Sequence, residues 1–405
     1  MKAGYLSQYF TGVAAKKLSA VEADVFRSHQ HEFNGVEGLK KLFGEANDSK
    51  INYIAKFLYL NDSDDEPVTA DGFLTWYDAR ARHPKRSEHR LYFPTTTVSM
   101  CAAEGDLLVI GMRPDNPVVV VIAEKDSTVA NQILWLFGIN DISHPGFSVR
   151  GELESEQDRI AFASRIILEQ IGVEIQDSAD TYLDDMIEMF GGSFPPTKDF
   201  SEYARSTLRD VNALECPDIA LMSWMEREEI LFRTLERYLI AERLSQGFVV
   251  DDFLSLSLSV QNRRKSRVGY ALENHMEKIF ADCGVLYDRT KVTENKSKPD
   301  FIFPSIKKYH DVSFNQVLLT MLGVKSTCKD RWRQVLTEAD RIEYKHLLTL
   351  EAAISENQTN EMNDRKLQLV LPRTLHSTYL PKQQVWIIDI ASFINLVKEK
   401  QASIF

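Results

Sequence analysis

Two segments in the C-terminal half of this 405-residue chain set its architecture: KSKPDFIFP at residues 296–304 and NQVLLTMLGVKSTCKDRWRQVLTEADR at residues 315–341. In the first, Asp300 directly precedes the apolar residues Phe-Ile-Phe, a composition that favours a strand. The second predicts an apolar strand ending at Lys325, a polar turn, and a helix with Trp332 and Val335 on its core side. The pattern therefore predicts an α/β domain that places an acid and a lysine at the ends of two strands.

A helix is predicted just upstream, where residues 262–280 read NRRKSRVGYALENHMEKIF. Leu272, Met276 and Ile279 recur at helical spacing and form its apolar face. Glu273 and Glu277 stand four residues apart, so both carboxylates can share another face. For Glu273, an ion pair with a neighbouring arginine is one role that this position allows. A further helix is predicted over residues 221–244.

The N-terminal part of the chain has a different character. Short apolar runs alternate with turn residues, and the clearest predicted strands are residues 91–93, 106–111 and 118–123, the last two flanking the turn-rich RPDNP. Residues 151–217 are acidic and less regular and contain the helix-breaking GGSFPP. We therefore expect a β-rich domain over residues 1–150, a connector over 151–217 and a second domain over 218–405.

Composition excludes several classes of protein. No run of about 18 apolar residues could span a bilayer, and the first residues lack the apolar core of a signal peptide, so a cytoplasmic protein is expected. The four cysteines show no CxxC spacing, which argues against a zinc site or a disulfide framework. The net charge is −11, yet residues 255–345 contain 17 Lys and Arg against 11 Asp and Glu. Basic charge is thus concentrated around the candidate chemistry, as nucleic-acid binding requires.

Phosphodiester hydrolysis needs hard oxygen ligands for Mg²⁺, a group that orients or activates water, and positive charge near the phosphate. Pro299 and Asp300 followed by Lys325 resemble the motif of the PD-(D/E)XK nuclease superfamily. That resemblance implies a mixed central sheet flanked by helices. The motif normally has an acid two residues before the lysine, but Gly323 stands there. A subgroup of restriction enzymes that cut CCGG, CCNGG or CCWGG sites takes this acid from the helix after the lysine, where Glu338 lies.

Within that subgroup, the chain resembles the EcoRII family of type II restriction endonucleases, through SVQNRRKSRVGYALENHMEKIF, KPDFIFP, YHD and VKSTCKDRWRQVLTEADRI, over roughly residues 225–380. The resemblance implies a homodimer that cuts double-stranded DNA at a CC…GG site, with a methyltransferase in the same system. It makes Asp300 and Glu338 the Mg²⁺ ligands, Lys325 the catalytic lysine and Glu273 a supporting acid. It also assigns Lys329, Asp330 and Arg331 to reading C:G pairs. This agrees with the physics, since arginine can bridge the acceptors of guanine and aspartate can accept from cytosine.

Further basic residues are predicted to contact DNA, with solvated surface as the alternative reading. In the C-terminal part they are Arg263, Arg264, Lys265, Arg267 and Arg333. In the N-terminal part the basic run between residues 80 and 90 supplies Arg80, Arg82, Lys85, Arg86 and Arg90. By resemblance, the N-terminal domain would be an effector domain that binds a second copy of the site.

Two other functions fit the same sequence features. One is a nuclease of this superfamily that nicks or repairs DNA, and paired cuts at one fixed sequence would distinguish the restriction enzyme from it. The other is a catalytically silent DNA-binding regulator. The presence of Asp300, Lys325 and Glu338 together argues against the silent regulator, because a scaffold without activity has no physical reason to hold all three.

Overall fold

The computed structural model describes residues 2, 4–24, 31–46, 50–63, 66–83, 85–114, 117–140, 142, 146–175, 182–245, 247, 249–327 and 331–404. The chain forms two compact units. The N-terminal unit comprises Met1–Ile175, Ala352–Glu356 and Thr378–Leu380, and the C-terminal unit comprises Gln176–Glu351, Asn357–Ser377 and Pro381–Phe405. In the described part of the chain, no helix combines the length and apolar character needed to cross a membrane.

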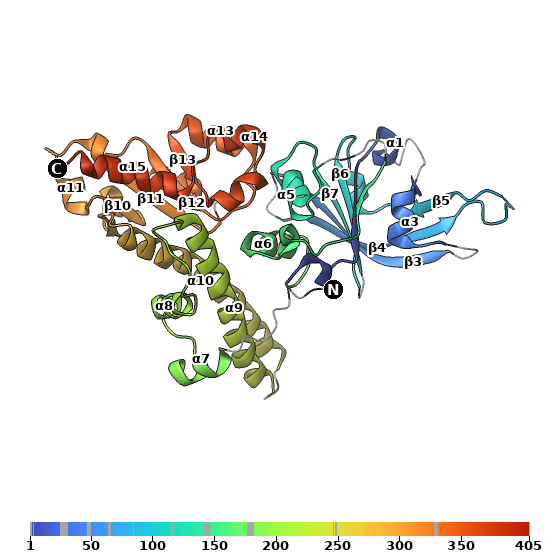
Figure 1. Ribbon diagram of the computed structural model, residues 1–405, viewed down its shortest axis with the longest axis horizontal. Coiled ribbons are helices and arrows are strands. Elements are labelled where there is room, and N and C mark those ends of the chain that lie inside the picture. Colours follow the sequence, from blue (N-terminus) through green and yellow to red (C-terminus); the bar gives the residue numbers. More distant parts are fainter. Residues whose placement is uncertain are drawn as a thin grey trace. The chain divides into compact units, whose positions relative to one another are not determined.

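The N-terminal unit is built on one eight-stranded sheet with short helices against it (Figure 1). The strands follow the order β2-β5-β4-β3-β7-β6-β1-β8, in which only β3 and β7 pair in parallel. Its elements are β1 (Gly12–Lys17), α1 (Ala20–Ala23), β2 (Glu32–Asn34), α3 (Glu37–Phe43), β3 (Ile51–Leu60), β4 (Val68–Asp78), β5 (His89–Tyr92), α4 (Thr97–Cys101), β6 (Leu107–Met112), β7 (Val118–Ala123), α5 (Thr128–Leu136), β8 (Ser148–Arg150) and α6 (Phe162–Gln170). The β-rich N-terminal part expected from the sequence is confirmed.

Strand β7 explains why this sheet is stable. Its six residues, VVVVIA, are all buried, which is the pattern of a strand covered on both faces. Alternate residues point to opposite faces, so Val119 and Val121 join the core beneath α5 and α6, while Val118 and Val120 join the core beneath α3 and α4. Figure 1 shows α5 and α3 on opposite sides of the sheet. The predicted hairpin is present, because β6 and β7 pair antiparallel.

The C-terminal unit has a smaller, mixed sheet of five strands in the order β13-β12-β11-β10-β9. Strands β11, β12 and β13 run parallel, whereas β9, β10 and β11 pair antiparallel. Its elements are α7 (Leu183–Phe190), α8 (Thr197–Ser206), α9 (Pro217–Leu244), α10 (Val250–Asp282), β9 (Asp288–Arg289), β10 (Phe301–Phe303), α11 (Ile306–His310), β11 (Thr320–Lys325), α12 (Trp332–Leu336), β12 (Lys345–Thr349), α13 (Glu356–Asp364), β13 (Leu367–Val370), α14 (Pro381–Gln384) and α15 (Ile390–Ala402). The α/β class with a mixed sheet and flanking helices is thereby confirmed.

Aromatic packing fixes helices α10 and α15 on the sheet. Phe280 of α10 meets Phe301 and Phe303 of β10 edge-on, with ring centroids 5.2 and 5.1 Å apart. Phe393 of α15 lies 5.7 Å from Phe303 on the same cluster. Residues two apart on a strand share one face, so both helices cover the face of β10 that carries Phe301 and Phe303. The long helix α10 is thus held against β10, the strand that directly follows Asp300.

The predicted connector, residues 151–217, is divided between the two units. Ile167 and Leu168 of α6 belong to the core of the N-terminal unit. Phe200 of α8 packs with Phe232 and Leu235 of α9 in the C-terminal unit. The acidic and irregular composition of residues 151–217 as a whole did not predict these helices.

Candidate active site

The strand register brings Asp300 and Lys325 together. Strands β10 and β11 pair antiparallel with Phe301 opposite Leu322, so the start of one strand adjoins the end of the other. The Oδ2 atom of Asp300 accepts a hydrogen bond from the backbone N–H of Val324 at 2.6 Å and one from Lys325 Nζ at 2.8 Å. Both side chains are largely shielded, with exposed fractions of 13% for Asp300 and 21% for Lys325. The acid and lysine predicted at strand ends therefore form one ion pair.

Gly323 lies on β11 between these groups, and the structure explains why no acid stands there. A Cβ at this position would lie 2.9 Å from Val335 Cγ2 and 3.1 Å from Val335 Cγ1. Val335 is fully buried on α12, so it cannot give way at small cost. The close approach of α12 to β11 therefore excludes a side chain at residue 323.

Glu338 follows α12 instead of lying on it. The sequence predicted a helix long enough to include this residue, but α12 ends at Leu336 after five residues. Thr337 caps the helix, and Ala339 has a left-handed backbone with φ of 51°. The turn is supported by Lys345 at the start of β12, whose Nζ donates to the carbonyl oxygen of Leu336 at 3.0 Å. The prediction that Glu338 lies on the helix after the lysine is therefore wrong, because the helix ends two residues before it.

The environment of Glu338 is unusual for a carboxylate. Its Oε2 atom is buried and has no hydrogen-bond partner among the described residues. Burial, together with the nearby charge of Asp300, raises the pKa of Glu338 to about 7, although Lys325 and Lys345 oppose the shift.

Glu273 stands beside Asp300 but is engaged by an arginine. The Nη2 atom of Arg289 donates to Glu273 Oε2 at 2.8 Å, and Nη1 donates to Glu277 Oε2 at 2.8 Å. Burial raises the pKa of Glu273, the hydrogen bond from Arg289 opposes this, and the charge of Asp300 raises it further. Glu273 and Glu277 both bind Arg289, so they share a face of α10 as predicted. The ion pair that was the alternative for Glu273 is therefore present.

A hollow of about 460 Å³ opens beside these groups in the C-terminal unit. It is lined by Lys265, Ser266, Gly269, Tyr270, Glu273, Val324, Lys325, Ser326, Thr327, Arg331 and Gln334. Lys265 and Arg331 are exposed, so two predicted DNA contacts lie at the rim of the hollow that Lys325, the predicted catalytic lysine, also lines. Lys329 and Asp330, predicted to read bases with Arg331, lie outside the described residues.

The other predicted DNA contacts of this unit differ in availability. Arg333 is exposed and forms an ion pair with Glu361 at 2.8 Å. The guanidinium of Arg263 lies 4.5 Å from the centre of the Phe194 ring, and that of Arg264 pairs with Glu236 at 2.6 Å.

Arg267 corrects the sequence-based prediction. Its side chain is only 6% exposed and pairs with Glu228 at 3.4 Å and with Glu229. Such a buried guanidinium cannot reach a phosphate. Arg267 therefore joins α10 to α9 and does not belong to a DNA-contacting surface. Its neighbours in sequence gave no sign of this, because the two acids that bind it are almost 40 residues away.

The basic loop of the N-terminal unit follows β4. Arg80, Arg82, Lys85 and Arg86 are exposed. Arg80 contacts Glu88 at 2.5 Å, and Arg90 on β5 contacts Glu88 and Asn34, which offsets part of the positive charge. Arg82, Lys85 and Arg86 are exposed to solvent, and their contact with DNA stays a prediction.

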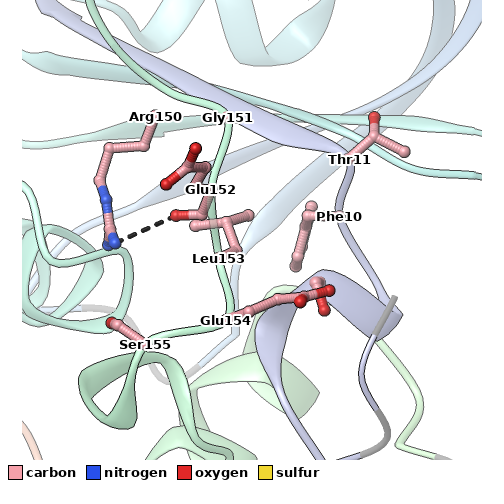
Figure 2. A pocket seen from close by; sticks show the side chains of 9 residues that line it. Phe10, Thr11, Arg150, Gly151, Glu152, Leu153, Glu154 and Ser155 are labelled. Atoms are coloured by element: carbon pink, nitrogen blue, oxygen red, sulfur yellow. Dashed lines mark hydrogen bonds between the residues drawn. The ribbon is translucent and has the colours of Figure 1, made fainter.

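The N-terminal unit also has a hollow of about 1010 Å³, shown in Figure 2. It is lined by Ser7, Phe10, Thr11, Arg150, Gly151, Glu152, Leu153, Glu154 and Ser155. The guanidinium of Arg150 is committed to Asp158 at 2.9 Å and to the carbonyl of Glu152 at 3.2 Å. Two glutamates with no uncommitted cation in the lining disfavour a phosphate ligand, so this hollow is a poor candidate for DNA.

The C-terminal acids fit a divalent cation in the chemistry of their oxygens. Magnesium binds few carboxylates and retains several waters. Asp300 and Glu338 can supply those carboxylates, and the partnerless buried oxygen of Glu338 is the kind of atom that a cation satisfies. Across the described residues, no group of three or more His, Cys, Asp or Glu side chains is placed to hold a metal ion. The third nearby acid, Glu273, is turned to Arg289.

Two contributors to this site were missed by sequence reasoning. Arg289 lies between the predicted helix of residues 262–280 and the segment KSKPDFIFP, in no motif of its own, and Lys345 is the first residue of an apolar strand. Neither has a local signal, because each acts through residues distant in the chain: Glu273 for Arg289 and Leu336 for Lys345.

Comparisons with known proteins identify several to which this chain is similar. A family model described as EcoRII C terminal matches residues 232–394. The type II restriction enzyme EcoRII of Escherichia coli is 30% identical over 387 residues, which cover 94% of this chain and 93% of that enzyme. Among solved structures, the restriction endonuclease PspGI with substrate DNA matches 56% of this chain and 98% of its own, at 17% identity and a TM-score of 0.44. Metal-depleted Ecl18kI with uncleaved, modified DNA matches 56% and 86%, at 17% identity and a TM-score of 0.46.

The chain is a type II restriction endonuclease, an enzyme that cleaves DNA internally. The identity extends over nearly the whole length of both sequences, including the N-terminal unit. The chain belongs to the EcoRII family.

Proposed function

We propose that this enzyme hydrolyses both strands of double-stranded DNA at a CCWGG-type sequence, using Mg²⁺ and leaving 5′-phosphate ends. CCNGG and other CC…GG sites are the close competitors. The observation that supports the proposal is the ion pair of Asp300 and Lys325 near Glu338, whose buried Oε2 has no hydrogen-bond partner among the described residues. A restriction endonuclease needs such a set, since hydrolysis requires both metal-binding oxygens and a cation near the reacting phosphate.

In this proposal Asp300 and Glu338 hold the metal, which would stabilise charge on the phosphate and on the leaving 3′-oxygen. Lys325 orients or deprotonates the attacking water, and its contact with Asp300 at 2.8 Å keeps its ammonium at the strand end. Val324 donates its N–H to Asp300 and so fixes that carboxylate. Lys265 and Arg331, at the rim of the hollow, contact the DNA.

Recognition and assembly complete the proposal. Arg331, with Lys329 and Asp330, reads the C:G pairs, and two copies of the chain bind the two halves of a palindromic site. The N-terminal unit contacts a second copy of the site through its basic loop. The enzyme acts in the cytoplasm, where a methyltransferase of the same system protects the host DNA.

Digestion of a plasmid of known sequence in the presence of Mg²⁺, followed by sequencing of the ends, tests the proposal. Paired cuts at one CC…GG sequence are expected. A digest that yields only nicks, or cuts at unrelated sequences, would contradict it.

The matched pair of variants is Lys325→Ala and Lys307→Ala. Both remove a lysine, but Lys307 is an exposed residue of α11. Lys325→Ala should lower cleavage at least about 100-fold, as loss of a group that handles the proton does, and should spare specific binding. Lys307→Ala should leave both unchanged. Full-rate cleavage by Lys325→Ala would refute the assignment.

A further inference from the structure

We propose that Arg289 is a positioning residue of this nuclease site, which fixes Glu273 of α10 relative to Asp300 of the sheet. The inference rests on the proposed function, because it takes Glu273 and Asp300 as parts of one site. It adds a residue outside the motifs that define the family resemblance, and it explains how two acids from different elements are held in register.

The first observation is the set of partners of Arg289. One edge of the guanidinium binds Glu273 through Nη2 at 2.8 Å. The other nitrogen, Nη1, binds Glu277 at 2.8 Å and Asn274 Oδ1 at 3.0 Å. All three partners lie within little more than one turn of α10, so the planar fork grips the helix at several points.

The second observation is where Arg289 comes from. It ends β9, and its backbone is paired with Phe301, the residue after Asp300. The next residue, Thr290, donates its backbone N–H to the carbonyl oxygen of Asp300 at 3.0 Å. Two consecutive residues therefore hold Glu273 and Asp300. Arg289 binds the carboxylate of Glu273 through its side chain, and Thr290 binds the backbone carbonyl of Asp300 through its own backbone.

The third observation is the shielding of these contacts. The side chains of Arg289, Glu273 and Glu277 are 21%, 18% and 28% exposed. The guanidinium carbon lies 5.9 Å from the centre of the Phe301 ring, which supports it from the sheet side. A largely shielded, multiply bonded arginine holds its partners more firmly than a surface ion pair does.

The chemical consequence concerns two like charges. Glu273 and Asp300 repel each other, and a free Glu273 side chain would rotate toward water. Arg289 cancels part of this repulsion and leaves the carboxylate in one orientation, so that α10 does not have to be repositioned when the metal and DNA bind. Lysine cannot do the same, because one ammonium lacks the planar fork that bridges two carboxylates and an amide.

The test compares Arg289→Lys, Arg289→Met and the control Lys278→Met in the full-length enzyme. Lys278 is a cation of α10, 47% exposed, and pairs with Asp282 one turn further along the helix. Changes to residues that orient metal-site groups cost roughly 10- to 100-fold in metal affinity or activity. Both Arg289 variants should therefore lower kcat by about that factor with little change in KM for DNA, and the control should match the unchanged enzyme.

A second readout does not depend on cleavage. Mn²⁺ binding to the enzyme on a non-cleavable duplex, followed by the loss of the free-ion electron paramagnetic resonance signal, should be about tenfold weaker in both Arg289 variants. Urea unfolding reports whether each variant is folded, and Arg289→Lys, which keeps the charge, guards against simple misfolding. A folded Arg289→Lys with unchanged kcat and unchanged Mn²⁺ binding would overturn the proposal.

A double-mutant cycle separates positioning from a general structural role. If Arg289 acts through Glu273, then Glu273→Gln combined with Arg289→Lys should be no slower than Glu273→Gln alone. Fully additive losses would show that Arg289 acts elsewhere. Failure of the proposed function is distinct, because it would appear as full cleavage by Lys325→Ala whatever the Arg289 variants do.

Discussion

Changing Glu338 to Gln should stabilise the metal-free enzyme at pH 8 while abolishing cleavage. The carboxylate is partly buried, and its Oε2 has no hydrogen-bond partner in the described part of the chain. Glutamine has nearly the same shape but no charge to bury. The variant therefore loses a metal ligand and at the same time removes an unfavourable charge from the folded state.

The magnitude follows from the pKa of Glu338. Burial, with the charge of Asp300, moves this pKa from 4.5 to about 7, so the folded state disfavours the ionised form. Each tenfold change in a protonation equilibrium corresponds to about 1.4 kcal/mol, which gives an upper limit of about 3 kcal/mol. Because the group is partly exposed to solvent, screening reduces the expected gain from Gln to about 1–2 kcal/mol at pH 8.

The sign of the pH dependence is fixed by the direction of the shift. A carboxyl whose pKa is raised on folding binds its proton more tightly in the folded state. Its contribution to stability is fully present below pH 4.5 and is lost as the pH rises to about 7. The advantage of Gln over Glu should therefore be largest at pH 8 and less than half as large at pH 5.

Urea unfolding in EDTA at both pH values measures this difference, and Glu399→Gln, at an exposed position of α15, is the control. Added Mg²⁺ should stabilise the unchanged enzyme more than the Glu338→Gln variant, since a ligand stabilises only the state that binds it. Lower stability of the variant at pH 8, or the same gain at pH 5 and pH 8, would refute the account of Glu338 given above.

Three further changes test other parts of the structure. Gly323→Ala should destabilise the enzyme by about 1–3 kcal/mol in urea unfolding, because its Cβ would lie 2.9 Å from Val335 Cγ2. The double variant with Val335→Ala should lose less unfolding free energy than the sum of the two single changes, and strictly additive losses would contradict the clash. Arg267→Met should cost about 3–5 kcal/mol, because it removes the buried cation that Glu228 and Glu229 share, whereas Lys265→Met should leave the unfolding free energy unchanged and weaken DNA binding. Replacing Arg82, Lys85 and Arg86 together by Ala should make the salt dependence of DNA binding shallower by up to about 3 in log–log slope, about 0.9 per lost phosphate contact; an unchanged slope in a binding titration would exclude the loop from the interface.

Local sequence patterns predicted the elements of the site well. The apolar run after Asp300 and the run before Lys325 are strands β10 and β11, and the helical spacing around Glu273 lies within α10. These signals succeed because burial imposes a period on consecutive residues. The C-terminal end of α12 was less predictable, because residues of helical composition continue past Leu336 although the helix ends there.

The ion pairs between residues distant in the chain could not be predicted from the sequence. Arg267 looked like its basic neighbours, but acids on α9 bury it. Arg289 had no motif of its own and gains its importance from a strand pairing that places it beside Asp300. In both cases the role of a charged side chain depends on which distant segment the fold brings next to it, and period and composition do not contain that information.

The shortness of α12 has a consequence for engineering the enzyme. Arg331 caps this helix at one end and Glu338 follows its other end, with five helical residues between them. Val335, near the end of α12, has little room to move toward β11, because its Cγ2 lies only 2.9 Å from the place that a Cβ on Gly323 would take. A redesign that shifts Arg331 would therefore also displace Glu338. Libraries that vary residues 328–331 to change the proposed base recognition should vary residues 332–338 at the same time, so that the resulting enzymes still cut DNA.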